Sequence, residues 1–224
     1  MLVKDYMTSH PIMVEPALKV TEAQKLLVDN HIRHLPVVGD GKRLLGLVTT
    51  RRLAVSMDQL TSLNVWELNR FLSELTVSKV MISGPDLHTI HPDATLEAAA
   101  ELMIQHKISG LPVVADGVVI GIITETDLLV ELQNLLGAID AGWRAVVRVP
   151  DRLGEFRKTV RAIGDQGWGI MAMGSVRSPR HPGFWDVILK VRHCTREELE
   201  RTLNGIPDQV LVDLRETKAT KTSQ

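Results

Sequence analysis

The residues best suited to chemistry are Thr124 and Asp127, which lie three apart in the phrase GIITETD. A helix that begins after Thr124 leaves the N–H groups of its first turn unpaired, and these groups and the helix dipole favour a phosphate. The Asp127 carboxylate offers two acceptor oxygens, which match the two adjacent hydroxyl donors of a ribose. The same spacing is also typical of an ordinary helix cap that needs no ligand.

An echo of this phrase, GLVTTRR, lies earlier in the chain and contains Thr49, Arg51 and Arg52. Arg52 stands where the later phrase has Asp127, and an arginine cannot accept a ribose hydroxyl. Cations at the start of a helix are disfavoured by about 0.3–1 kcal/mol each. That placement indicates a nearby anion, either a ligand phosphate or an acidic side chain. The alternative is that both arginines extend into solvent at little cost.

The echo belongs to an internal duplication. HIRHLPVVGDG (31–41) matches KISGLPVVADG (107–117), and the residues upstream, 14–30 and 90–106, also match. Within each unit an extended segment precedes a helix, for which Thr21 or Thr95 supplies a capping hydroxyl. LPVV, a DG turn and a second apolar run predict two strands in a hairpin, followed by another helix. Each unit is therefore expected to be β-α-β-β-α.

The rest of the chain divides by pattern into a linker, a third segment and a tail. We expect a helical linker at 57–77, because leucines and aromatic residues recur there at close spacing. After Gly137 the order of strand and helix signals becomes β-α-β-β-α-β, the ferredoxin-like arrangement. Thr195 and Glu198 have the spacing of a capping box. The polar residues 217–224 are expected to form a frayed tail.

The duplicated unit, in which SGLPVV (109–114) is followed by GIITETD (121–127), resembles a CBS domain. The third segment, with VPDRLGEF (149–156) before its first helix, is similar to an ACT domain. The order of the three resembles the acetoin-utilisation AcuB-like proteins. The resemblance implies an α/β (α+β) fold with tandem CBS domains packed as a pseudo-twofold pair and a C-terminal ferredoxin-like βαββαβ ACT domain. The first CBS domain would then span 1–56, the linker 57–77, the second CBS domain 78–137 and the ACT-like domain 138–216, followed by the tail.

The resemblance to CBS pairs implies an adenine nucleotide or related adenosyl ligand in the cleft: AMP, ADP, ATP or S-adenosylmethionine. It implies that Asp127 contacts the ribose. It also implies that the adenine lies beside the loop where Ser109 and Gly110 are small enough for a base to approach the backbone. The residues so assigned are Thr89, Ile90, Ile108, Ser109, Gly110, Leu111, Pro112, Thr124 and Asp127.

The first unit departs from this pattern, because the bulky Arg33 and His34 replace Ser109 and Gly110. A standard adenosine pose is therefore not expected there. The resemblance implies that the two clefts lie close together, so Arg51 or Arg52 would reach the phosphates of a nucleotide held by the second unit. The residues of this altered or phosphate-binding site are Val14, Arg33, His34, Pro36, Thr49, Arg51 and Arg52.

The turn before the helix of the third segment is a further candidate. ACT domains commonly bind amino acids at this turn, at an interface between two copies. The residues concerned are Asp151, Arg152, Leu153 and Gly154. The alternative is a plain turn into a helix, with the sheet used only for dimer packing.

Composition excludes several classes of protein. With 26 basic and 27 acidic residues and a net charge of −1, broad nucleic-acid or membrane electrostatics are not expected. The single Cys194 excludes an internal disulfide framework and any CxxC metal site. The N-terminus lacks the apolar run of a signal peptide, and no apolar stretch reaches about 18 residues, so we expect a cytoplasmic protein.

No catalytic or metal site is expected. The sequence contains no P-loop, GxSxG, HExxH or dinucleotide fingerprint. Cys194 has no evident base partner. The pairs His31/His34 and His88/His91 lack acidic or cysteine partners at matching spacing.

These observations together predict a non-catalytic regulatory protein that requires no cofactor. A homodimer is expected, and a regulated enzyme is a possible partner. The alternatives are a structural dimerisation module with vestigial ligand sites, or a regulatory subunit of an acetoin or central-metabolism enzyme.

Overall fold

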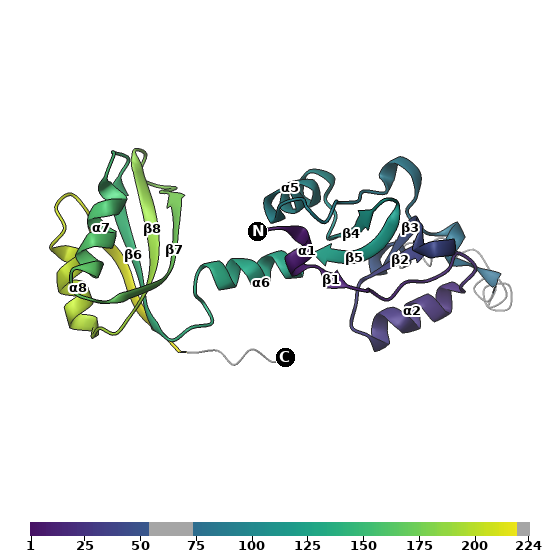
Figure 1. Ribbon diagram of the computed structural model, residues 1–224, viewed down its shortest axis with the longest axis horizontal. Helices are drawn as coiled ribbons and strands as arrows, with labels where there is room; N and C mark the ends of the chain where they lie inside the picture. Colours follow the sequence, from purple (N-terminus) through teal and green to yellow (C-terminus); the bar gives the residue numbers. More distant parts are fainter. Residues whose placement is uncertain (54–73, 219–224) are drawn as a thin grey trace. The chain divides into compact units, whose positions relative to one another are not determined.

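The computed structural model describes residues 1–53 and 74–218. The expected helical linker at 57–77 and the tail at 217–224 therefore lie largely outside the described residues. The chain divides into two compact units, Met1–Leu128 and Leu129–Gln224 (Figure 1). No helix in the described ranges is both long enough and apolar enough to cross a membrane.

The two expected hairpins form the small sheets of the N-terminal unit. Strand β2 (His34–Val38) pairs antiparallel with β3 (Leu44–Thr49), and β4 (Gly110–Ala115) pairs antiparallel with β5 (Val118–Thr124). The second hairpin turns at Asp116 and Gly117, whose φ values are 50° and 80°, as a DG turn requires. The first hairpin instead contains a 3₁₀ turn, η1 (Asp40–Lys42).

A helix packs beside each hairpin: α2 (Val20–Asp29) in the first repeat and α5 (Leu96–His106) in the second. The Thr95 hydroxyl accepts a 3.1 Å hydrogen bond from the N–H of Ala98, so Thr95 caps α5 as predicted. The prediction for Thr21 is wrong, because α2 already begins at Val20. The N–H of Val20 donates to the Leu75 carbonyl at 2.9 Å, so a distant segment fixes the start of α2.

The N-terminal segment of the chain packs on the second repeat. It contains α1 (Val3–Tyr6) and β1 (Thr8–Ser9). The N–H of Val3 donates to the Ala94 carbonyl at 2.8 Å, and β1 pairs antiparallel with β5. Val3 is fully buried in the core of this repeat, and Tyr6 and Met7 pack against that core. The second repeat is thus completed by residues that precede the first.

The equivalent segment before the second repeat packs on the first. It includes the 3₁₀ turn η2 (Val77–Lys79), and η3 (Gly84–Asp86) follows it. Val77 donates to the Leu18 carbonyl at 2.8 Å, and Ile82 pairs with Leu47. Leu75, Val77 and Val80 are buried in the core of the first repeat. The two repeats therefore exchange equivalent segments, and neither core is built from one repeat alone.

This exchange explains the glycine that opens each of the two related phrases. A Cβ on Gly46 would lie 2.8 Å from the Ile82 carbonyl oxygen and 2.9 Å from Met81 Cγ, and a Cβ on Gly121 would collide with Met7. The exchanged segments therefore cross their partner strands close to these glycines, with backbone against Gly46 and the Met7 side chain against Gly121.

Gly46→Ala and Gly121→Ala are each expected to destabilise the protein by about 1–3 kcal/mol, because the added methyl group meets tightly packed atoms. Gly164→Ala is the control, since a Cβ there meets nothing within 4 Å and the residue ends a helix. Urea unfolding measures all three. Equal effects at Gly46, Gly121 and Gly164 would contradict the close crossing.

The C-terminal unit is one four-stranded antiparallel sheet with two helices. Its elements are β6 (Gly142–Pro150), α7 (Glu155–Gly164), β7 (Gly169–Arg177), β8 (Phe184–Arg192), α8 (Arg196–Asn204) and β9 (Val210–Thr217). The strand order is β7-β8-β6-β9, and both helices cover one face of the sheet (Figure 1). The predicted ferredoxin-like order is confirmed, as is the capping box of Thr195 and Glu198.

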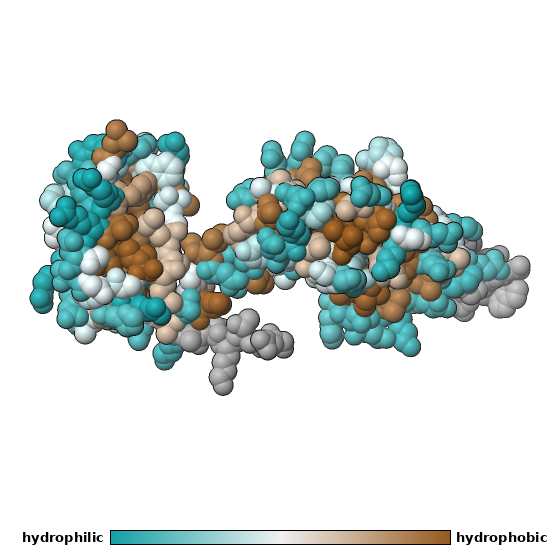
Figure 2. Space-filling model, viewed as in Figure 1, coloured by the Kyte–Doolittle hydropathy of each residue, from teal (hydrophilic) through white to brown (hydrophobic). Residues whose placement is uncertain are grey.

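Helix α6 (Glu125–Leu135) follows β5 and leads from the first unit into the second. None of its residues is buried, and Leu129, Leu132 and Leu135 are 61%, 50% and 55% exposed. Figure 2 shows apolar side chains on the surface of this helix. Leucines at this spacing form an exposed apolar stripe along α6.

Candidate functional site

A pocket of about 630 Å³ lies between the two repeats of the N-terminal unit. This volume is within the range of roughly 300–1,000 Å³ that is common for small-molecule sites. The first repeat lines it with Arg33, His34, Leu47, Thr49, Thr50, Arg51 and Arg52, and the second with Ile82, Asp86, Leu87, His88, Lys107, Ile108, Ser109, Gly110 and Glu125.

The pocket combines residues that the sequence assigned to different sites. Thr49, Arg51 and Arg52 of the first repeat line it together with the loop Ile108–Gly110 of the second. Thr124 and Asp127 are not among its lining residues. In the second repeat the loop lies beside its own phrase, since Gly110 pairs with Thr124 and the Ser109 carbonyl accepts from the N–H of Glu125 at 3.1 Å. The sequence predicted that Arg51 or Arg52 would reach a ligand held by this repeat, and both arginines line the same pocket as its loop.

His34 stands at the contact between the repeats. Its Nε2 lies 3.0 Å from the Ser109 hydroxyl, and a Cβ on Gly110 would lie 3.0 Å from the same imidazole. The imidazole therefore occupies the space beside Gly110 that the sequence left open for a base. It also explains why a glycine stands opposite the bulky residue of the first repeat.

Asp127 closes the first turn of α6. One of its carboxylate oxygens, Oδ2, accepts hydrogen bonds from the Thr124 N–H at 2.7 Å and from the Thr124 hydroxyl at 2.8 Å. In the first repeat the roles are reversed, since the Thr49 hydroxyl accepts from the N–H of Arg52 at 3.2 Å. Both phrases thus serve as helix caps, whether or not they also contact a ligand.

Two arginines of the first repeat reach neighbouring segments. Arg33 donates from Nη2 to the Thr126 hydroxyl at 3.1 Å, which brings the phrase of the second repeat next to the loop of the first. Arg52 donates from Nε to the Val80 carbonyl at 3.3 Å. Arg33 therefore lies where both the pocket and the Thr124–Asp127 phrase are within its reach.

Several other candidates lie in the cores rather than in the pocket. Val14 and Ile90 are each 6% exposed, and each forms a parallel bridge to the strand behind it, with Val37 and Val113 respectively. Leu111 is fully buried in the core of the second repeat. Pro36 and Pro112 are buried strand residues, and Thr89 is exposed.

Burial lowers the pKa of His34 from 6.5 to about 4, with a further contribution from the Arg33 cation, while the Asp127 carboxylate acts in the opposite direction. Because the unfolded chain then binds a proton that the folded chain does not, stability falls as the pH falls from about 6.5 toward 4. The loss is at most about 3 kcal/mol.

His34→Gln is expected to flatten this dependence, because glutamine does not titrate and can still bond to Ser109. Urea unfolding followed by circular dichroism between about pH 4.5 and 7.5 measures the slope. His31→Gln, at an exposed position in the same segment, should keep the wild-type slope. An unchanged slope in His34→Gln would show that His34 is not the titrating group.

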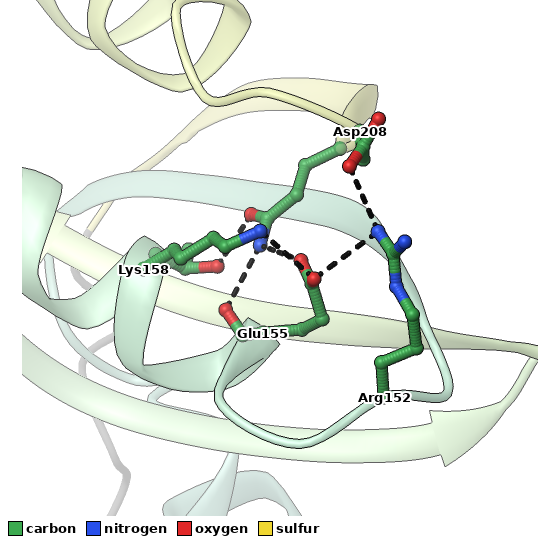
Figure 3. Close-up of polar contacts among 6 residues, drawn as sticks. Arg152, Glu155, Lys158 and Asp208 are labelled. Atoms are coloured by element: carbon green, nitrogen blue, oxygen red, sulfur yellow. Dashed lines mark hydrogen bonds and ion pairs between the residues drawn. The ribbon is translucent and has the colours of Figure 1, made fainter.

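The candidate ligand turn of the C-terminal unit is held by its own ion pairs (Figure 3). Arg152 Nη2 lies 2.8 Å from Asp208 Oδ2 and 3.2 Å from Glu155 Oε1. Lys158 donates to the same Glu155 oxygen at 2.8 Å. Gln209 donates to the Glu155 carboxylate and backbone carbonyl, at 3.2 and 2.8 Å. The turn is thereby tied to the start of β9.

The remaining residues of this turn differ in their surroundings. Gly154 has a φ of 85° and precedes α7, so it supplies a left-handed conformation. Asp151 donates its N–H to Gly183 at 2.8 Å, and its carboxylate lies 3.7 Å from Arg177. Leu153 is fully exposed at the tip.

The surroundings of His88, His91 and Cys194 do not indicate a metal site or a reactive thiol. His88 stacks on His106 with ring centroids 3.6 Å apart, and His91 lies 3.7 Å from Asp93. Within residues 1–53 and 74–218, no group of three or more His, Cys, Asp or Glu side chains could hold a metal ion. Burial raises the pKa of the Cys194 thiol, with a smaller contribution from Glu198, and this disfavours a reactive thiolate.

Among the charged residues of the pocket, sequence reasoning missed Asp86, Lys107 and Glu125. The repeat alignment could have indicated Lys107, because it occupies the position that His31 has in the first repeat. Glu125 lies within the phrase GIITETD but was given no role, and Asp86 belongs to no motif. The buried hydrogen bonds among Glu155, Thr159 and Gln209 were missed because Gln209 is far away in sequence.

A family model described as the CBS domain matches residues 3–57 and 77–134, and the chain belongs to this family. The two matches coincide with the two repeats, so the N-terminal unit is a CBS-domain pair. The match ends at residue 134, within α6, and does not reach the sheet of the C-terminal unit.

Among solved structures, the chain is similar to a Vibrio cholerae protein assigned to acetoin utilization (AcuB), with 34% identity and a TM-score of 0.52, covering 61% of this chain and 93% of that one. It is also similar to the CBS domain pair of protein MJ0100 in complex with 5′-methylthioadenosine and S-adenosyl-L-methionine. Identity there is 29% and the TM-score 0.50, over 59% of this chain and 95% of that one.

Among curated proteins, the CBS domain-containing protein YhcV of Bacillus subtilis is 33% identical over 132 residues, which are 59% of this chain and 86% of that protein. L-Aspartate semialdehyde sulfurtransferase of Methanocaldococcus jannaschii is 30% identical over 128 residues, or 57% of this chain. The matched region is 22% of the sulfurtransferase, and the chain likewise spans less than a quarter of the homoserine O-acetyltransferases it matches.

Proposed function

We propose that this protein is a non-catalytic regulatory protein that binds an adenine nucleotide or a related adenosyl compound between its two CBS repeats. The observation that carries the proposal is the pocket, which has the size of a small-molecule site and is lined by both repeats. The ligands named for the MJ0100 CBS pair, 5′-methylthioadenosine and S-adenosyl-L-methionine, support an adenosyl compound here.

Within this proposal the two phrases have different tasks. Arg51 and Arg52 line the pocket and are suited to phosphate, because arginine donates several hydrogen bonds and keeps its charge. Asp127 is the proposed ribose acceptor of the second phrase. Its Oδ2 atom closes the helix, so Oδ1 would accept from the ribose.

Calorimetry on the full chain tests the proposal, with adenosine, AMP, ADP, ATP, 5′-methylthioadenosine and S-adenosylmethionine as ligands. At least one is expected to bind with a dissociation constant below about 0.1 mM, which corresponds to more than about 5 kcal/mol. Absence of heat for all six would contradict the proposal. It would favour the alternative of a structural dimerisation module with vestigial sites.

Ligand binding would act by population shift. A ligand that touches both repeats favours the arrangement in which both sets of contacts are made, and it stabilises that arrangement by its difference in affinity. Such a ligand would also shift the conformation of the exchanged segments, because Ile82 both lines the pocket and pairs with β3. A partner enzyme that binds one arrangement would sense the ligand.

We assign the C-terminal unit to an ACT-like domain that serves dimerisation or a second small ligand. Its ferredoxin-like strand order supports the assignment. The ion pairs that Arg152 and Glu155 make within the turn favour a structural turn over an amino-acid site, because they occupy the charges that would hold such a ligand.

A homodimer is part of the proposal, and the exposed leucines of α6 support it. Leu132→Asp is expected to convert the dimer to a monomer, because a carboxylate in an apolar interface is not solvated. Asn134→Asp, at an exposed position on the side of the helix away from Leu132, adds the same charge and should leave the dimer intact. Light scattering after gel filtration measures the mass. A Leu132→Asp dimer would place the interface elsewhere.

The similarity to the Vibrio cholerae protein assigned to acetoin utilization favours an enzyme of acetoin metabolism as the regulated partner. Purified enzyme assayed with and without this protein, at saturating ligand, tests the assignment. A change in rate that requires both the protein and the ligand is expected, and an unchanged rate would contradict it.

A further inference from the structure

The lining of the pocket carries more positive than negative charge. Four of its residues are permanent cations, namely Arg33, Arg51, Arg52 and Lys107, whereas two are acids, Asp86 and Glu125. Three of the cations come from the first repeat and one from the second. The positive charge therefore belongs to the cleft between the repeats and not to one element.

Within the described residues, no ion pair joins Arg33, Arg51 or Lys107 to a carboxylate. Arg33 is instead bonded to the neutral hydroxyl of Thr126 at 3.1 Å. Arginines of the C-terminal unit behave differently: Arg148 pairs with Asp186 at 2.8 Å and Arg144 with Asp213 at 3.1 Å. Among the described residues, the charges of Arg33, Arg51 and Lys107 are thus not cancelled by ion pairs in the way that those of Arg144 and Arg148 are.

The histidine in the pocket does not change this balance. His34 is 7% exposed and lies against Ser109 and Gly110, where burial keeps it neutral at pH 7. The imidazole can share a hydrogen bond with the Ser109 hydroxyl, but it adds no charge to the pocket. The excess of positive charge therefore rests on the arginines and the lysine.

We propose that the pocket selects its adenosyl ligand by charge: it takes adenosine phosphates, more tightly as the number of phosphates grows, and it discriminates against the cationic S-adenosylmethionine. This inference rests on the proposed function, because it concerns the same site. Each added phosphate charge gains Coulomb attraction from Arg33, Arg51 and Lys107, which form no ion pair within the part of the chain that the structure describes, while a sulfonium is repelled by them. Three of the four cations, Arg33, Arg51 and Arg52, are arginines with the guanidinium fork that binds phosphate.

Calorimetry at two salt concentrations tests the proposal on the full chain, without divalent cations that would mask the phosphates. The probes are adenosine, AMP, ADP, ATP, S-adenosylmethionine and inorganic pyrophosphate. Affinity is expected to rise about threefold to tenfold with each phosphate, as about 1 kcal/mol per charge pair implies. S-Adenosylmethionine should bind less tightly than adenosine. Added salt should weaken ATP binding and leave adenosine binding unchanged.

Lys107→Gln sharpens the test, because it removes one pocket cation at an exposed position outside the cores. It should lower the affinity for ATP about threefold to tenfold and leave that for adenosine unchanged. Lys25→Gln, at an exposed position on α2, removes the same charge elsewhere and should change neither.

The outcomes separate this inference from the proposed function. S-Adenosylmethionine binding as tightly as ATP, or equal affinities for adenosine and ATP, would overturn charge selection while leaving an adenosyl site in place. Pyrophosphate binding that Lys107→Gln weakens, with no adenosyl compound bound, would support the cationic pocket and overturn the proposed function. Absence of binding by every probe would overturn both.

Discussion

Replacing Arg51 with glutamate is expected to weaken ATP binding by about 30-fold or more. The change removes a cation that lines the pocket and places a carboxylate where the phosphates would lie. Loss of a charge-assisted hydrogen bond is worth about 1.5–3 kcal/mol, and like-charge repulsion adds to it. Because Arg51 is exposed at the start of its helix, the fold should not depend on it.

Lys25→Glu is the matched control, since it makes the same change of two charge units at an exposed position on α2 outside the pocket. Calorimetry with ATP compares the two variants, and the melting temperature of each shows whether it remains folded. If Arg51→Glu bound ATP as the unmodified protein does, the arginine would extend into solvent and the phosphate role of the first phrase would be wrong.

The largest expected effect on stability is that of Glu155→Ala, at about 2–4 kcal/mol. Glu155 is 4% exposed, and its carboxylate accepts hydrogen bonds from Lys158, Gln209 and Arg152 (Figure 3). Removing it leaves the buried Gln209 amide with fewer acceptors, and an unsatisfied buried donor is costly. Glu216→Ala, at an exposed position of β9, should cost less than about 0.5 kcal/mol.

The pH dependence checks the same contacts. Hydrogen bonds from Lys158 and then from Gln209 lower the pKa of Glu155, so the ionised form stabilises the fold. That contribution is present above the usual pKa of a glutamate, about 4.3, and is lost as the pH falls through the lowered value. Glu155→Gln should therefore lose stability at pH 7 and show a flatter decline in acid. A Glu155→Ala variant as stable as Glu216→Ala would contradict the role of this carboxylate.

Individual strands and helices could be predicted from local sequence patterns. The DG turn and the apolar runs beside it predicted the β4–β5 hairpin, because positive φ values at Asp116 and Gly117 are a local requirement. The order of strand and helix signals after Gly137 predicted the sheet of the C-terminal unit. The duplication predicted a paired architecture, and the CBS family match to both repeats agrees with it.

Local sequence patterns could not predict which of these strands and helices pack against one another. The apolar character of Val3 and Val77 shows that each is buried, but not that each is buried in the other repeat. The pocket depends on the packing of the two repeats, so the sequence left the space beside Gly110 open for a base, whereas in the structure the His34 imidazole of the other repeat lies there. Thr21 was misassigned because pairing with Leu75, and not a hydroxyl, fixes the start of α2.

Hydrogen–deuterium exchange of the full chain with and without ATP tests the central claim most directly, because it reports where the ligand lies. We expect protection in both repeats at once, at Thr49–Leu53 and at Lys107–Gly110, since both segments adjoin the pocket or line it. Strands β6 to β9 should exchange as before. Protection confined to the C-terminal unit, or to one repeat alone, would contradict a ligand bound between the two CBS repeats.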